Sequence, residues 1–266
     1  MIPWITGNAP FPPVAQALRS PSGLLAAGGD LSAPRLLEAY RHGIFPWFSA
    51  GEPVLWWSPD PRMVLIPAEF RISRSLARVL RNTSYEVRCD TAFELVMRAC
   101  AAPRSGRNGS GCDTLLAKPA DCGSSRPAAL SAPEGSASPC HSGHTWIHED
   151  MIAAYCALHE MGHAHSVEVW IGGKLAGGLY GVAIGRMFYG ESMFSHTSNA
   201  SKIALAHLAV QLGRWQFSMI DCQMNTAHLA SLGAREIPRS EFIARLQELV
   251  HCAPVTHWQF DTDLFA

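Results

Sequence analysis

Residues 165–195 read HSVEVWIGGKLAGGLYGVAIGRMFYGESMFS, and this stretch decides the fold. Apolar Val167, Val169 and Ile171 alternate with their neighbours, and a period of two predicts a strand with one buried face. Gly172 and Gly173 form a turn. The segments 174–185 and 186–194 continue as two more strands, so we expect a three-stranded antiparallel meander.

The segments on either side of the meander predict helices and one further strand. The predicted order is helix, meander, helix, strand, helix, which suggests an α+β, acetyltransferase-like (GNAT-like) domain with a mainly antiparallel sheet flanked by helices. The supporting segments are a helix at 145–162 ending at Gly162, a helix at 198–215, a buried strand at 217–223 and closing helices at 225–234 and 239–250.

Residues 1–60 are rich in Pro, Gly and Trp, and we expect them to form a small N-terminal domain, followed by the GNAT-like domain at 61–266. One helix should begin after Ser32 and end at Gly43. FPWFSAGEPVLWWSPDP at 45–61 is predicted to be a loop, because its prolines and glycine oppose regular structure. Its tryptophans could pack as a hydrophobic plug or stack on bases, and both interpretations stay open.

Residues 103–143 are rich in Ser, Gly, Pro and Ala and contain few bulky apolar residues. Such a segment cannot bury enough apolar surface to offset the entropy of ordering it. We therefore predict a disordered insertion between two elements.

Four arginines within 70–82 are spaced by three, four and three residues, which predicts that they share one face of a helix. No acidic residue interrupts this arginine stripe, so a phosphate-binding surface and an ordinary solvated helix face both remain open. The stripe consists of Arg71, Arg74, Arg78 and Arg81.

The sequence His159-Glu160-Met161-Gly162-His163 has the H-E-x-x-H spacing of zinc metalloproteases. That site needs a helix through both histidines and a third ligand downstream. Gly162 precedes His163, a strand pattern follows, and no downstream histidine extension exists. We therefore predict a helix end here and no metal site.

The net charge of −1 excludes a polycation, so any binding of nucleic acid must come from a local patch. No apolar run approaches the roughly 20 residues that span a bilayer, and the first residues lack the pattern of a signal peptide. We expect a cytoplasmic protein with no membrane partner.

Three polar residues in apolar surroundings are candidates for chemistry. Glu191 lies between Gly190 and Ser192 on a predicted strand, and a lone buried carboxylate needs a partner, in a salt bridge or in a functional site. Asp221 and Gln223 are two apart on a strand and should point to one face. Such a pair could orient an amine and a carbonyl, or cap a neighbouring helix.

Four long segments together resemble the leucyl/phenylalanyl-tRNA–protein transferase family over nearly all of the chain outside 103–143: 23–65, 145–170, 177–195 and 220–239. The resemblance implies transfer of leucine or phenylalanine from Leu-tRNA or Phe-tRNA to the N-terminal α-amine of proteins that begin with Arg or Lys, which marks them for degradation. It also implies that no cofactor, metal or acyl-CoA is used. We expect a monomer.

The resemblance also implies roles for individual residues. Asp221 and Gln223 match the proposed catalytic pair, and Glu191 matches a carboxylate that lines the active site. The arginine stripe would contact acceptor-stem phosphates. The matched substrate-binding residues are Trp47, Trp146 and Tyr155 near the 3′-terminal adenosine, and Leu179 and Phe188 in the amino-acid pocket.

The chain departs from the family pattern in two places. The insertion falls just before Trp146, and MNTAH after the DCQ motif leaves the roles of Asn225 and Thr226 open.

An acyl-CoA N-acetyltransferase is a second interpretation, but 195–202 lacks the glycines of a pyrophosphate loop. A non-catalytic RNA-binding module is a third, and it leaves the three candidate polar residues without a role.

Overall fold

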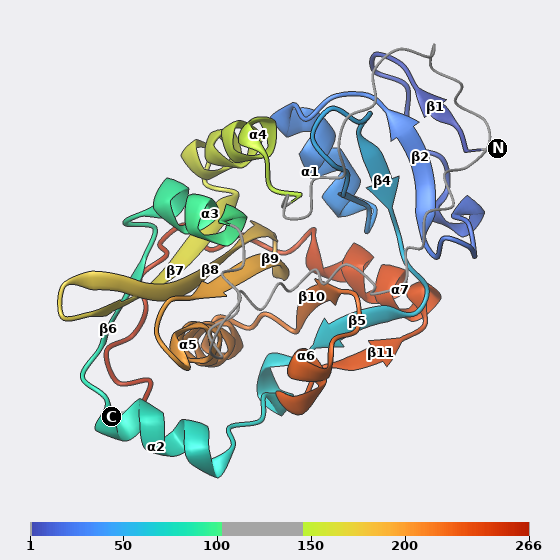
Figure 1. The fold of residues 1–266 in the computed structure, drawn as a ribbon. Coiled ribbons are helices and arrows are strands. Elements are labelled where there is room, and N and C mark those ends of the chain that lie inside the picture. The colour runs from blue at the N-terminus through green and yellow to red at the C-terminus, as the bar shows by residue number, and fades with distance from the viewer. Residues whose placement is uncertain (1, 103–145, 266) are drawn as a thin grey trace.

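The computed structural model describes residues 2–102 and 146–265, so the insertion predicted at 103–143 lies outside the described residues. The described chain forms two sheets with helices packed around them (Figure 1). This arrangement confirms the prediction of an α+β protein.

The first sheet has four short strands in the order β1-β2-β4-β3. Its strands are β1 Trp4–Ile5, β2 Leu24–Gly28, β3 Phe45–Pro46 and β4 Leu55–Trp57. The prediction of an irregular loop at 45–61 is therefore wrong, because β3 and β4 pair within this segment. Strands of two or three residues between prolines are too short to show a period of two. Trp56 fixes the sheet, since its buried ring donates a hydrogen bond to the Gly28 carbonyl.

The helix predicted between Ser32 and Gly43 is present as α1 (Ala33–Arg41). Its first turn contains a proline, which suits the start of a helix. Tyr40 on this helix is completely buried. The helix ends before Gly43, whose φ of +72° favours glycine.

The second sheet has seven strands in the order β11-β5-β10-β9-β8-β7-β6. The predicted meander is confirmed as β7, β8 and β9, and only the β9–β10 pair of this sheet is parallel. The strands are β5 Arg62–Leu65, β6 Glu86–Cys89, β7 Ala164–Ile171, β8 Lys174–Ile184, β9 Met187–Ser195, β10 Met219–Gln223 and β11 Arg235–Ile237.

Helices cover both faces of the seven-stranded sheet (Figure 1). Leu179 of β8 packs in the cluster formed with α5, whereas its neighbour Tyr180 packs in the cluster that includes residues of α3 and α4. The second of these clusters also contains α1 and the first sheet, so one core joins the two sheets. The remaining helices are α2 Arg74–Asn82, α3 Phe93–Ala101, α4 Glu149–Glu160, α5 Ala200–Arg214, α6 Ala227–Ser231 and α7 Arg239–Leu249.

No helix within the described ranges is long and apolar enough to cross a bilayer.

Candidate active site

The parallel strands β9 and β10 separate at the centre of the second sheet. Their pairing ends at Asp221 and Tyr189, although β9 continues to Ser195. Gln223 and Glu191 each lie two residues beyond this last pair. The end of the pairing therefore places an amide and a carboxylate on neighbouring strands.

The simple alternation predicted for Asp221 and Gln223 is wrong in detail. The pairing of β10 with β5 shifts register between these two residues, and Gln223 has a φ of +54°. A non-glycine residue rarely adopts this left-handed conformation, and it costs roughly 1–2 kcal/mol. The backbone turn, not strand periodicity, sets where the Gln223 side chain lies.

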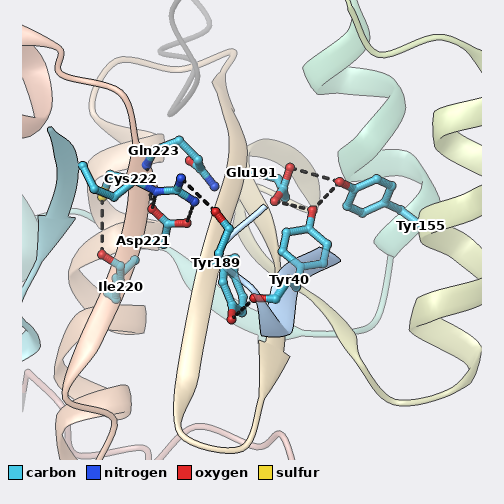
Figure 2. A network of polar contacts seen from close by, with 10 residues as sticks. Tyr40, Tyr155, Tyr189, Glu191, Ile220, Asp221, Cys222 and Gln223 are labelled. Carbon is cyan, nitrogen blue, oxygen red and sulfur yellow. Dashed lines mark hydrogen bonds and ion pairs between the residues drawn. The ribbon is translucent and has the colours of Figure 1, made fainter. Parts of the chain in front are cut away.

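Glu191 is completely buried, and two tyrosine hydroxyls donate hydrogen bonds to its carboxylate (Figure 2). The Tyr40 hydroxyl lies 2.7 Å from Oε1 and the Tyr155 hydroxyl 3.2 Å from Oε2. The two hydroxyls also contact each other. Burial raises the pKa of Glu191 to about 7, against the hydrogen bonds from the tyrosines, which lower it. Glu191 can therefore hold or release a proton near neutral pH.

Asp221 has a partner that the sequence analysis missed. Arg62 donates from Nε to Oδ1 at 2.8 Å and from Nη2 to Oδ2 at 2.6 Å, and both side chains are buried. The backbone N–H of Gln223 also donates to Oδ1, at 2.9 Å. Both carboxylate oxygens of Asp221 therefore already accept hydrogen bonds from the protein.

The side-chain amide of Gln223 is the opposite case. Both its nitrogen and its oxygen are buried, and neither makes a hydrogen bond to any part of the chain that the structure describes. Leaving a buried polar group unpaired costs roughly 1–3 kcal/mol per group. In Figure 2 this amide lies beside the strand that carries Glu191. A polar substrate group between β9 and β10 could satisfy it.

The three predicted nucleoside-binding residues pack against the same hydrophobic cluster. Tyr155 lies within it, and Trp47 and Trp146 are half-buried at its edge. The Trp47 ring packs edge-on against Trp57 at 5.4 Å, and the Trp57 indole donates to the Trp47 carbonyl. The Trp146 indole nitrogen is buried without a hydrogen-bond partner among the described residues. All three residues therefore border the one cluster that joins the two sheets.

Leu179 and Phe188 lie on the other face of the sheet. Both are completely buried in the cluster formed with α5. They come from β8 and β9, which also carries Glu191, so an apolar region and the polar network share these strands on opposite faces.

The arginine stripe is only partly helical. The helix α2 begins at Arg74, after Ser73, whose hydroxyl accepts a hydrogen bond from the Leu76 N–H. Arg71 precedes the helix and its N–H donates to the Leu232 carbonyl, so placing Arg71 on the helix was wrong. The capping serine starts the helix at Arg74, three residues later than the charge spacing indicated. All four arginines are exposed, and none forms an ion pair within the described ranges.

The zinc-like motif is a helix end, as predicted. Helix α4 ends at Glu160, and Gly162 has a φ of +75°. The His163 N–H donates back to the Leu158 carbonyl, which closes the helix before His163. The described residues contain no group of three or more His, Cys, Asp or Glu side chains placed to hold a metal ion.

Two family models match most of the chain. The model described as "Leucyl/phenylalanyl-tRNA protein transferase N-terminal domain" matches residues 29–60, and the model described as "Leucyl/phenylalanyl-tRNA protein transferase" matches 64–114 and 134–247. The chain belongs to the leucyl/phenylalanyl-tRNA–protein transferase family. The predicted family and the prediction of an aminoacyltransferase are therefore confirmed.

Similar curated proteins carry the name Leucyl/phenylalanyl-tRNA--protein transferase. One from Nitrosospira multiformis is 58% identical over 94% of this chain and 93% of its own length. One from Nitrosomonas europaea is 56% identical over 98% and 96%, respectively, and one from Chromobacterium violaceum is 54% identical over 98% and 97%. The likeness extends over both sheets, so it covers every candidate residue of the site.

Two residues of the polar network were not selected from the sequence. Neither Tyr40 nor Arg62 is among the site residues that the sequence predicts. An arginine at the start of an apolar strand indicates a buried cation, and a buried cation needs a partner of opposite charge. That signal does not identify the partner, since Asp221 is 159 residues away along the chain.

Proposed function

We propose that the chain transfers leucine or phenylalanine from aminoacyl-tRNA to the N-terminal α-amine of proteins that begin with Arg or Lys, marking them for degradation. The observation that carries the proposal is the buried, unpartnered amide of Gln223 beside Glu191 where β9 and β10 separate. Family membership supplies the chemistry, aminoacyl transfer, which such a site must support.

The reaction is aminolysis of an ester. The neutral α-amine attacks the ester carbonyl carbon, the bond from that carbon to the 3′ oxygen breaks, and the amine proton ends on the departing 3′ hydroxyl. The ester is already activated, so the demand on the protein is orientation and stabilisation of the oxyanion. Gln223 would supply the orientation by hydrogen bonding the amine or the carbonyl, and Asp221 would hold Gln223 in place.

Glu191 would hold a cationic or amine group of the acceptor. Its carboxylate is fixed by Tyr40 and Tyr155, so it cannot rotate away from the site without losing two hydrogen bonds. Its raised pKa makes its charge dependent on pH near neutrality. An amine that approaches it would favour the charged carboxylate.

Apolar and aromatic residues would bind the rest of the aminoacyl end. Leu179 and Phe188 would line the amino-acid pocket, where a purely apolar wall selects by shape and size. Trp47, Trp146 and Tyr155 would contact the terminal adenosine, with the indole N–H of Trp146 free to donate. Ring stacking on a base contributes about 1–3 kcal/mol per base.

The exposed arginines would contact tRNA phosphates. Arg74, Arg78 and Arg81 project from α2 into solvent, and Arg71 extends the patch from the preceding segment. Binding through phosphates releases counterions, so affinity should fall steeply as salt rises.

The remaining predictions belong to the same proposal. The separation of β9 and β10 is the feature of the second sheet that supports an acetyltransferase-like architecture for residues 61–266, with 1–60 as a small N-terminal domain. We further propose that the protein acts as a cytoplasmic monomer.

The test supplies purified protein with labelled Phe-tRNA and peptides that differ only at the first residue. Transfer to an Arg or Lys peptide is expected without CoA, ATP or added metal. A matched peptide with an acetylated N-terminus should receive nothing. Equal transfer to Arg, Ala and Asp peptides would refute the proposed acceptor class, while transfer to none would refute the proposed reaction.

A further inference from the structure

Arg62 occupies an unusual place for a cation. It begins β5, its side chain is completely buried, and its guanidinium lies between the rings of Phe45 and Phe242, at 4.8 and 4.6 Å from their centres. Two of its nitrogens bind Asp221, and Nη1 donates to the Gly43 carbonyl at 3.2 Å. A buried guanidinium needs such a full set of partners to offset lost hydration.

The ion pair of Arg62 with Asp221 holds the backbone of Gln223 in place. Asp221 Oδ1 accepts hydrogen bonds from both Arg62 Nε and the backbone N–H of Gln223. Gln223 has a left-handed φ that the strand alone would not impose. Such conformations persist where surrounding contacts over-determine them. The hydrogen bond from Gln223 to the immobilised carboxylate is one such contact.

We infer that Arg62 is a positioning residue for the transfer reaction, which acts through Asp221 to hold Gln223 with its amide facing the reacting groups. The inference rests on the proposed function of Gln223. Asp221 accepts hydrogen bonds from Arg62 and from the backbone N–H of Gln223, so its contribution in this arrangement is orientation. The fork of three nitrogens, rather than charge alone, is what Arg62 supplies.

The first test is Arg62→Lys, which keeps the charge but loses the two-pronged contact. Misplacing a reacting group by about 1 Å can cost about 100-fold in rate. We therefore expect kcat to fall by about 100-fold at constant KM for aminoacyl-tRNA. The matched control is Arg35→Lys, a buried arginine that binds the Gly7 and Ala9 carbonyls away from Gln223. Its kcat should stay at the wild-type value.

The second test separates positioning from general structural damage. In a Gln223→Ala background, Arg62→Lys should cause no further loss of kcat, because the group that it positions is gone. A purely structural role would lower kcat by the same factor in both backgrounds, and that result would overturn the inference. Wild-type kcat in folded Arg62→Lys would overturn it as well.

Asp221→Asn is the fallback if Arg62→Lys does not fold. It keeps an oxygen that can accept from the Gln223 N–H but loses the charge that holds Arg62. The same dependence on Gln223 is expected, and its absence would count against the inference. If the wild type transfers no amino acid at all, the proposed function fails. The crystal structure of either variant then decides: Gln223 should leave the left-handed region, and a retained φ near +54° would overturn the inference.

Discussion

Replacing Glu191 with glutamine tests the polar network through its linkage to stability. Glutamine has nearly the same shape and can still accept a hydrogen bond from Tyr40, but it carries no titrating proton. Burial raises the pKa of Glu191 from 4.5 to about 7. In the unfolded chain the carboxyl titrates normally, so folding and protonation are linked.

The raised pKa means that the folded protein binds this proton more tightly than the unfolded chain does. Its contribution to stability is therefore fully present below pH 4.5 and is lost as pH rises towards 7. Each pKa unit corresponds to about 1.4 kcal/mol. The contribution lost between pH 5 and pH 8 is then about 2–3 kcal/mol. The Glu191→Gln variant has no such contribution to lose. Its free energy of unfolding, relative to that of the wild type, should therefore rise by that amount between pH 5 and pH 8.

Equilibrium urea unfolding of both proteins at several pH values measures the difference between their free energies of unfolding. The contributions of the other titrating groups are the same in both proteins and cancel in that difference. The control is Glu86→Gln. Arg88 lowers the pKa of Glu86, so the difference between this variant and the wild type should stay constant above pH 5. A difference for Glu191→Gln that is equally constant would refute the assignment of a raised pKa to this carboxyl.

Three further changes have definite expected outcomes. Tyr40→Phe removes a hydrogen bond that lowers the pKa of Glu191, so the pH dependence of stability should move to higher pH, whereas Tyr189→Phe, which loses only a bond to a backbone carbonyl, should leave it in place. Gly181→Ala would push a Cβ into the Tyr189 carbonyl oxygen, and thermal unfolding should show a loss of roughly 1–3 kcal/mol. Arg78→Ala should weaken tRNA binding and reduce the slope of log affinity against log salt by about one; an unchanged slope would exclude a phosphate contact.

The local elements followed from the sequence because their causes are local. The period of two at 165–171, the glycine pair at 172–173 and the helix end at Gly162 each depend on neighbours a few residues away. The same reasoning failed at 45–61. The two strands there are too short to show a period of two, and they pair beside the buried Trp56. It failed at Arg71 because capping by Ser73, rather than charge spacing, sets the start of α2.

In the candidate site too, some features were predictable from the sequence and others were not. The sequence identified Glu191, Asp221 and Gln223 as polar residues in apolar surroundings, since the cost of burying a lone polar group can be read from its neighbours. Only the tertiary structure supplied their partners, because Tyr40 and Arg62 lie 151 and 159 residues away along the chain. The sequence by itself determined the meander, the helix ends and the residues that need partners. Folding decided which hydroxyls and which guanidinium meet them, because hydrogen bonds depend on distance in space and not on distance in sequence.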